Sequence, residues 1–144
     1  MIARYAARWL PLVLRLAGGT MLLAFGAALM PTDWMASTHQ RLGLGDFPAS
    51  PLVEYLTRSI SLIYGIHGGI LILGASDIQR LRPMLRYLGI SNIGLGLALA
   101  AVDLYAGLPW WWTTVEATSV LGFGVLLLVM LSAIPDRWQQ EAER

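Results

Sequence analysis

The chain has 144 residues, of which 56% are hydrophobic and 13% charged, and its formal net charge at pH 7 is +1. A soluble domain carries about twice that charged fraction, so the composition favours a membrane protein, and the length excludes a large soluble domain beside the membrane part. The small net charge gives no sign of a nucleic-acid partner. The absence of cysteine excludes disulfides, thiol redox chemistry and thiolate metal sites.

Four long apolar runs dominate the sequence: Leu10–Met30, Leu52–Ala75, Met84–Ala106 and Val115–Ile134. Each is long enough to cross a hydrocarbon core of about 30 Å at about 1.5 Å per helical residue. We therefore predict an all-α fold, an integral membrane four-helix antiparallel bundle that forms a single transmembrane domain over residues 1–144. The predicted helices cover about 10–30, 52–75, 84–106 and 114–134, and an outer connector covers 31–51.

The first helix is expected to begin near Pro11, because proline is tolerated in the first turn of a helix, and to end at Met30 and Pro31. The segment before it, MIARYAARWLP, has the basic character of a signal peptide. However, the apolar run that follows is longer than the usual core of about 7–15 residues, and no A-x-A cleavage site comes after it. We therefore expect a retained first helix.

The first connector, PTDWMASTHQRLGLGDFPASP, carries signals for a short helix. Thr32 can cap a turn that begins at Asp33, and Gly43 is a suitable stop after Leu42. The side chains expected on one face of this helix are Trp34, Thr38 and Leu42. The pattern predicts a short interfacial helix on the outer membrane surface, and a mobile outer loop is the alternative.

The remaining helix starts have their own signals. Ser50 followed by Pro51 is typical of a capped helix start, Pro83 is expected to begin the third helix, and Thr113 or Thr114 the fourth. The second and third connectors are much shorter than the first, which forces neighbouring helices to run antiparallel.

The basic residues are all arginine, and most lie in the termini and the second connector: Arg4, Arg8, Arg15, Arg80, Arg82, Arg86, Arg137 and Arg144. The first connector has only Arg41, and the third has none. The positive-inside rule therefore predicts cytoplasmic termini and a cytoplasmic second connector, with Trp110–Trp112 in the outer aromatic belt. The cytoplasmic basic connector of Arg80, Arg82 and Arg86 is read as this topology signal. The alternative is contact with anionic head groups or a soluble partner.

Helices pack closely in lipid through small and polar residues. Each predicted span has one such face, and the residues expected to make the packing contacts are Gly19, Gly26, Gly65, Gly69, Asn92 and Gly96. Gly65 and Gly69 form a GxxxG motif. The face expected to pack on the fourth helix carries Glu116, Val120, Phe123 and Leu127.

Ionisable residues inside the spans form a candidate polar cluster of Glu54, Arg58, Asp103 and Glu116, which antiparallel packing would bring together near the outer leaflet. One interpretation is structural: Arg58 bridges Asp103 or Glu116 and fixes the register of the helices. The other interpretation starts from three carboxylates facing one arginine. That excess could carry a proton or recruit a cationic ligand in an outer pocket.

His67 is the only histidine at membrane depth, beside Gly68 and Gly69, and is a candidate axial ligand for haem or chlorophyll. The alternative is a hydrogen bond to a neighbouring helix, with Tyr64 one turn earlier as a partner. No metal site is predicted, and the cofactor is unknown. The sequence has no H-E-x-x-H, G-x-S-x-G, P-loop or dinucleotide motif, which disfavours a self-sufficient enzyme.

The stretch LRLAGGTMLLAFGAAL resembles the opening helix of DoxX-like small bacterial membrane proteins, with Arg15, Gly19 and Gly26 at the matching spacing. The middle, LTRSISLIYGIHGGILILGASDIQRLRPMLRYLGI, looks like bacterial membrane proteins of this size. The resemblance implies a bacterial inner-membrane protein and permits an accessory role beside a quinone-linked oxidoreductase.

Three functions are compatible with these observations. The first is an accessory or interaction subunit that meets a protein partner, or a second copy, in the lipid bilayer. The second is a small transporter or a proton- or ligand-handling protein that uses the charged cluster. The third is a cofactor-binding subunit of a redox system.

Overall fold

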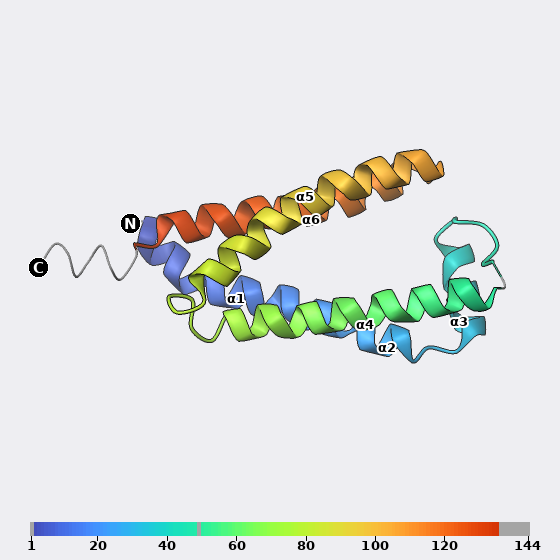
Figure 1. Ribbon diagram of the computed structural model, residues 1–144, viewed down its shortest axis with the longest axis horizontal. Helices are drawn as coiled ribbons and strands as arrows, with labels where there is room; N and C mark the ends of the chain where they lie inside the picture. The colour runs from blue at the N-terminus through green and yellow to red at the C-terminus, as the bar shows by residue number, and fades with distance from the viewer. Residues whose placement is uncertain (1, 49, 136–144) are drawn as a thin grey trace, which may run out of the picture. The chain divides into compact units, whose positions relative to one another are not determined.

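The computed structural model describes residues 2–48 and 50–135, and within these ranges the chain is helical and has no strand (Figure 1). Its helices in chain order are α1 (Ile2–Leu22), α2 (Ala24–Ala28), α3 (Thr32–Arg41), α4 (Pro51–Gly74), α5 (Arg82–Ala106) and α6 (Trp110–Ala133). The predicted all-α fold built on four long apolar helices is therefore confirmed.

Four segments are long and apolar enough to cross a membrane: Ala3–Ala28, which joins α1 and α2, and then α4, α5 and α6. Only 17% to 28% of the residues in their most apolar windows are buried inside the protein. Most of their apolar side chains therefore face outward, as hydrocarbon requires and as water disfavours. By length and composition, this is a multi-pass membrane protein.

Two helix starts differ from the prediction. α1 begins at Ile2 and contains Pro11, because the alanine, arginine and leucine residues before the proline are good helix formers and the membrane tolerates one missing backbone donor. α6 begins at Trp110, because Pro109 has the extended backbone of a residue that precedes a helix (φ −55°, ψ 137°). The three tryptophans therefore form the first turn of α6.

A turn at Leu23 separates α1 from α2 within the first span. The hydroxyl of Thr20 donates to the carbonyl of Leu16 (2.9 Å), and the Leu23 amide bonds three residues back, to Thr20. A hydroxyl that competes for a helix carbonyl in this way often bends the helix.

The packing divides the chain into two compact units, although the sequence analysis treats it as one transmembrane domain. The first, here called the α5–α6 unit, holds the described residues of 1–14 and 73–144. The second, the α1–α4 unit, holds Arg15–Ile72. α1 contributes to both units, which are described separately below.

In the α1–α4 unit, the carboxyl-terminal part of the first span runs antiparallel to α4. A Cβ atom added to Gly68 would lie 2.5 Å from the carbonyl oxygen of Gly18, and one added to Gly18 would lie 2.6 Å from that of Gly68. Further along, the ring of Phe25 occupies the space above Gly65. The two helices thus approach each other at backbone distance.

The predicted helix in the first connector is present as α3, and its only buried residue is Met35. Its first turn is preceded by Pro31, so Thr32 does not cap it as predicted. At its end Gly43 adopts φ +71°, and its amide bonds the carbonyl of Gln40 while that of Leu44 bonds His39. This pair of bonds is the Schellman arrangement, which favours glycine at that position.

In the α5–α6 unit, α5 and α6 lie side by side and antiparallel (Figure 1). A Cβ atom on Gly124 would lie 2.6 Å from the carbonyl oxygen of Gly89, and one on Gly96 would lie 2.9 Å from that of Ala117. The turn between the helices is short because Gly107, at φ +70°, ends α5. Small residues therefore set the separation of this helix pair.

At its other end, the α5–α6 unit gathers three segments that are distant in sequence. One open hollow of about 300 Å³ is lined by Ala7 and Pro11 of α1, by residues 75–79 and by Ile134. The side-chain amide of Gln79 also donates, through Nε2, to the carbonyl oxygen of Pro135 (3.1 Å). The start of the chain, the second connector and the end of α6 therefore share one end of this unit.

Candidate functional site

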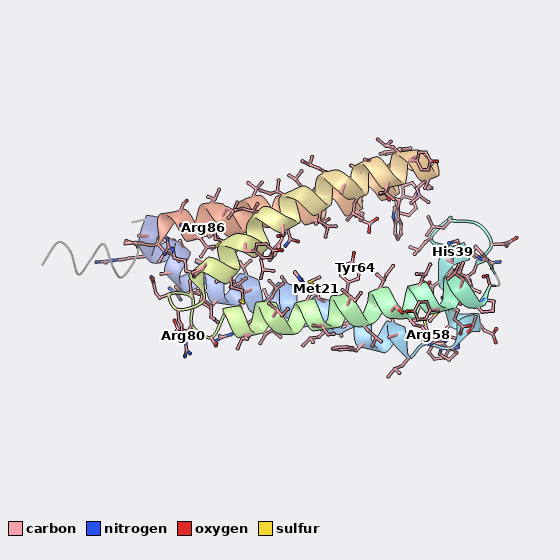
Figure 2. All side chains as sticks on the ribbon, in the orientation of Figure 1. Met21, His39, Arg58, Tyr64, Arg80 and Arg86 are labelled. Atoms are coloured by element: carbon pink, nitrogen blue, oxygen red, sulfur yellow. The ribbon has the colours of Figure 1, made fainter. Side chains whose placement is uncertain are left out.

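Two members of the predicted polar cluster meet in the α1–α4 unit. Arg58 donates to Glu54 Oε1 through Nη2 (2.8 Å) and Nε (3.3 Å), one turn apart on α4. The remaining guanidinium nitrogen, Nη1, donates to the carbonyl oxygen of Ala28 (2.6 Å), and Thr32 Oγ1 donates to Glu54 Oε1 (2.7 Å). Figure 2 shows Arg58 at this end of α4, beside α2 and α3.

Through these bonds the ion pair links α4 to α2 and α3. Ala28 is the last residue of α2, so the guanidinium lies at the negative end of a helix, where a cation is favourable. Glu54 lies in the first turn of α4, where an anion is favourable. Because Thr32 begins α3, the pair joins α4 to the end of one helix and the start of another.

The other two members of the cluster, Asp103 and Glu116, belong to the α5–α6 unit. Glu116 accepts a hydrogen bond from Trp112 Nε1 at 2.7 Å, one turn earlier on α6. The side chain of Asp103 is 3% exposed, and its Oδ2 atom has no hydrogen-bond partner among the described residues. The predicted meeting of all four residues involves both units and stays a prediction.

Arg82 caps a helix end, as Arg58 does, and the sequence did not indicate this role. Arg82 is buried, and its Nη2 donates to the carbonyl oxygens of Leu131 and Ile134, both at 2.7 Å. It therefore caps the end of α6 from the start of α5. Its position in a basic connector hid this role, because the sequence pattern does not distinguish an arginine facing water from one facing a helix end.

The other two residues of the basic connector, which is predicted to be cytoplasmic, are exposed. Arg80 lies in the turn before α5, where its backbone amide bonds Asp77 Oδ1 (3.0 Å), and Arg86 lies one turn into α5 (Figure 2). The interpretation of this connector as a topology signal thus rests on two exposed side chains, with the third engaged in packing.

The predicted packing residues divide into two groups. Gly65, Asn92 and Gly96 are buried, and Asn92 also donates to the Leu88 carbonyl on its own helix (2.8 Å). By contrast, nothing lies within 4 Å of a Cβ position at Gly19, Gly26 or Gly69.

The close backbone contact between the first span and α4 is made by Gly18 and Gly68 rather than by the predicted Gly19 and Gly69, whereas the predicted Gly65 does pack, against the ring of Phe25. Each helix carries two adjacent glycines, Gly18–Gly19 and Gly68–Gly69, so the sequence alone does not show which glycine of each pair is buried. On α6, the buried residues are Thr113, Ala117, Gly124, Leu127 and Leu131, so only Leu127 of the predicted face is buried.

His67 is half-buried on α4, next to Gly68, which packs against the first span. Among the described residues, no group of three or more histidine, cysteine, aspartate or glutamate side chains could hold a metal ion. Axial ligation of a cofactor by His67 stays a prediction. Comparisons of the chain with family models, curated proteins and solved structures find no match.

Proposed function

We propose that the protein is an accessory or interaction subunit of the bacterial inner membrane that binds a protein partner, or a second copy of itself, within the bilayer. One observation carries this proposal: four charged side chains of the spans, Asp103 not among them, bond helix ends or neighbouring side chains. Arg58 and Arg82 bond carbonyls at helix ends, and Glu54 and Glu116 accept bonds from nearby side chains. This leaves little polar chemistry for a reaction and favours a structural role.

The outward faces add support. Gly69, Gly94 and Gly122 lie on exposed helix surfaces with open space above them. Glycine in a membrane helix lets a second helix come to backbone distance, whereas lipid chains gain nothing from it. These positions therefore suit contact with a further helix.

A crosslinking scan tests the role. A photoreactive amino acid is placed at outward positions of α5 and α6, such as Leu97 and Val129, which are 60% and 58% exposed. We expect adducts of one defined mass, confined to one helix face and reproduced by native mass spectrometry of the complex in mild detergent. Adducts with lipid alone at every position, and a 15.8-kDa monomer in the mass spectrum, would contradict the proposal.

The orientation that we propose has both termini and the second connector in the cytoplasm, with α3 outside. The arginines at one end of the α5–α6 unit support it. The chain has no cysteine, so single-cysteine variants can be labelled without background. With a membrane-impermeant maleimide, Ser37→Cys in α3 is expected to react in intact spheroplasts, and Ser76→Cys only after permeabilisation. Both serines are exposed, so the opposite pattern would reverse the topology.

A further inference from the structure

Two buried polar side chains without partners lie at the turn end of the α5–α6 helix pair. Asp103 is one turn before the end of α5, and Thr113 is in the first turn of α6. Their exposed fractions are 3% and 9%, and neither Asp103 Oδ2 nor Thr113 Oγ1 has a hydrogen-bond partner in the described part of the chain. Buried polar atoms are nearly always satisfied, so two orphans together call for an explanation.

The packing register places both side chains in the same seam. Gly89 faces Gly124, and seven residues later Gly96 faces Ala117, seven residues earlier on α6. A further seven residues along α5, Asp103 lies opposite the first turn of α6. Thr113 precedes Ala117 by one turn on the buried face. The carboxylate and the hydroxyl therefore occupy the outermost layer of the α5–α6 interface.

The two arginines of the helix pair, Arg82 and Arg86, lie at the end of α5 opposite to Asp103. Between Arg86 and Pro135 the sequence contains Asp103 and Glu116 as acidic residues and no basic residue. Glu116, one turn after Thr113, is the one charged residue of α6 and is itself acidic. The end of α5 and the start of α6 bring opposite dipole ends together, so the backbone adds no net countercharge.

We propose that Asp103 and Thr113 form a binding site for a small monovalent cation, an alkali ion. Carboxylate and hydroxyl oxygens are the ligands that hard cations prefer. The site lies one turn from the end of α5, and intramembrane carboxylates of this kind mark ion sites. The inference is independent of the proposed accessory role, because the cation can be bound without being transported.

The test measures the thermal midpoint, Tm, of purified protein in NaCl, KCl and choline chloride at constant ionic strength and constant pH. A ligand that binds only the folded state raises Tm with its concentration. We expect a rise of about 4 °C, relative to choline, at roughly a tenfold excess of the bound cation over its dissociation constant. Choline is too large to enter the site and serves as the reference salt.

Asp103→Asn and Thr113→Val should each abolish the rise. Thr114→Val is the matched control, because the neighbouring hydroxyl is exposed and already bonded to the Trp110 carbonyl (2.7 Å). If Asp103→Asn does not fold, Thr113→Val decides the question. A wild-type Tm that is the same in the sodium, potassium and choline salts would overturn the site. A dependence that persists in Thr113→Val would also overturn it.

Discussion

Replacing Gly68 with alanine is expected to separate the first span from α4. The added Cβ would lie 2.5 Å from the carbonyl oxygen of Gly18 and 3.0 Å from the amide nitrogen of Leu22. Both are backbone atoms, so no side-chain rotation can relieve the overlap. Overpacking of this kind costs roughly 1–3 kcal/mol, and the rigid neighbours place this variant at the upper end.

The adjacent glycine provides the control. Gly69→Ala adds the same methyl group to open space, and alanine is about 1 kcal/mol better than glycine in a helix, so its stability should be unchanged or slightly higher. Thermal unfolding followed by circular dichroism in detergent measures both. The same contrast is expected between Gly18→Ala and Gly19→Ala on α1. Equal effects of the two members of either pair would refute the register.

The second large effect is expected for Arg82→Ala. This substitution removes two hydrogen bonds from a buried guanidinium to the carbonyls of Leu131 and Ile134, both 2.7 Å long. Hydrogen bonds to charged groups contribute about 1.5–3 kcal/mol each. We expect the free energy of unfolding to fall by roughly 2–4 kcal/mol, since some water can replace the lost donors at a helix end.

Arg86→Ala is the matched control for this variant, because Arg86 lies one turn further along α5 and is exposed. It should leave Tm unchanged. Hydrogen exchange gives a local readout, and the last turn of α6 should lose protection in Arg82→Ala alone. A similar loss of protection in both variants would mean that the contribution of Arg82 is one of general charge.

The sequence was sufficient for the features that depend on local chemistry. The apolar runs predicted four long helices, and Gly43 predicted the end of α3, because a left-handed backbone there favours glycine. Glu54 and Arg58, two members of the predicted polar cluster, meet because they are one helical turn apart on α4. Gly96 and Asn92 were identified as packing residues because small and polar residues are what lipid-embedded helices use for contact.

The sequence was insufficient where a choice depends on the partner helix. Gly18 and Gly19 differ by about 100° around α1, and only the position of α4 decides which of them is buried. Thr32 is a good capping residue in isolation, but Glu54 on α4 offers its hydroxyl a charged acceptor. Arg82 looked like a topology signal until the end of α6 was placed beside it.

The tight turn at Gly107 has a consequence for biogenesis. A short connector without basic residues has little that resists translocation, so α5 and α6 can enter the bilayer together as a helical hairpin. Their glycine contacts then form between neighbours in the chain, before any partner arrives. In the orientation proposed above, the Asp103 carboxylate crosses the membrane within that hairpin, so on this route it meets Thr113 during insertion.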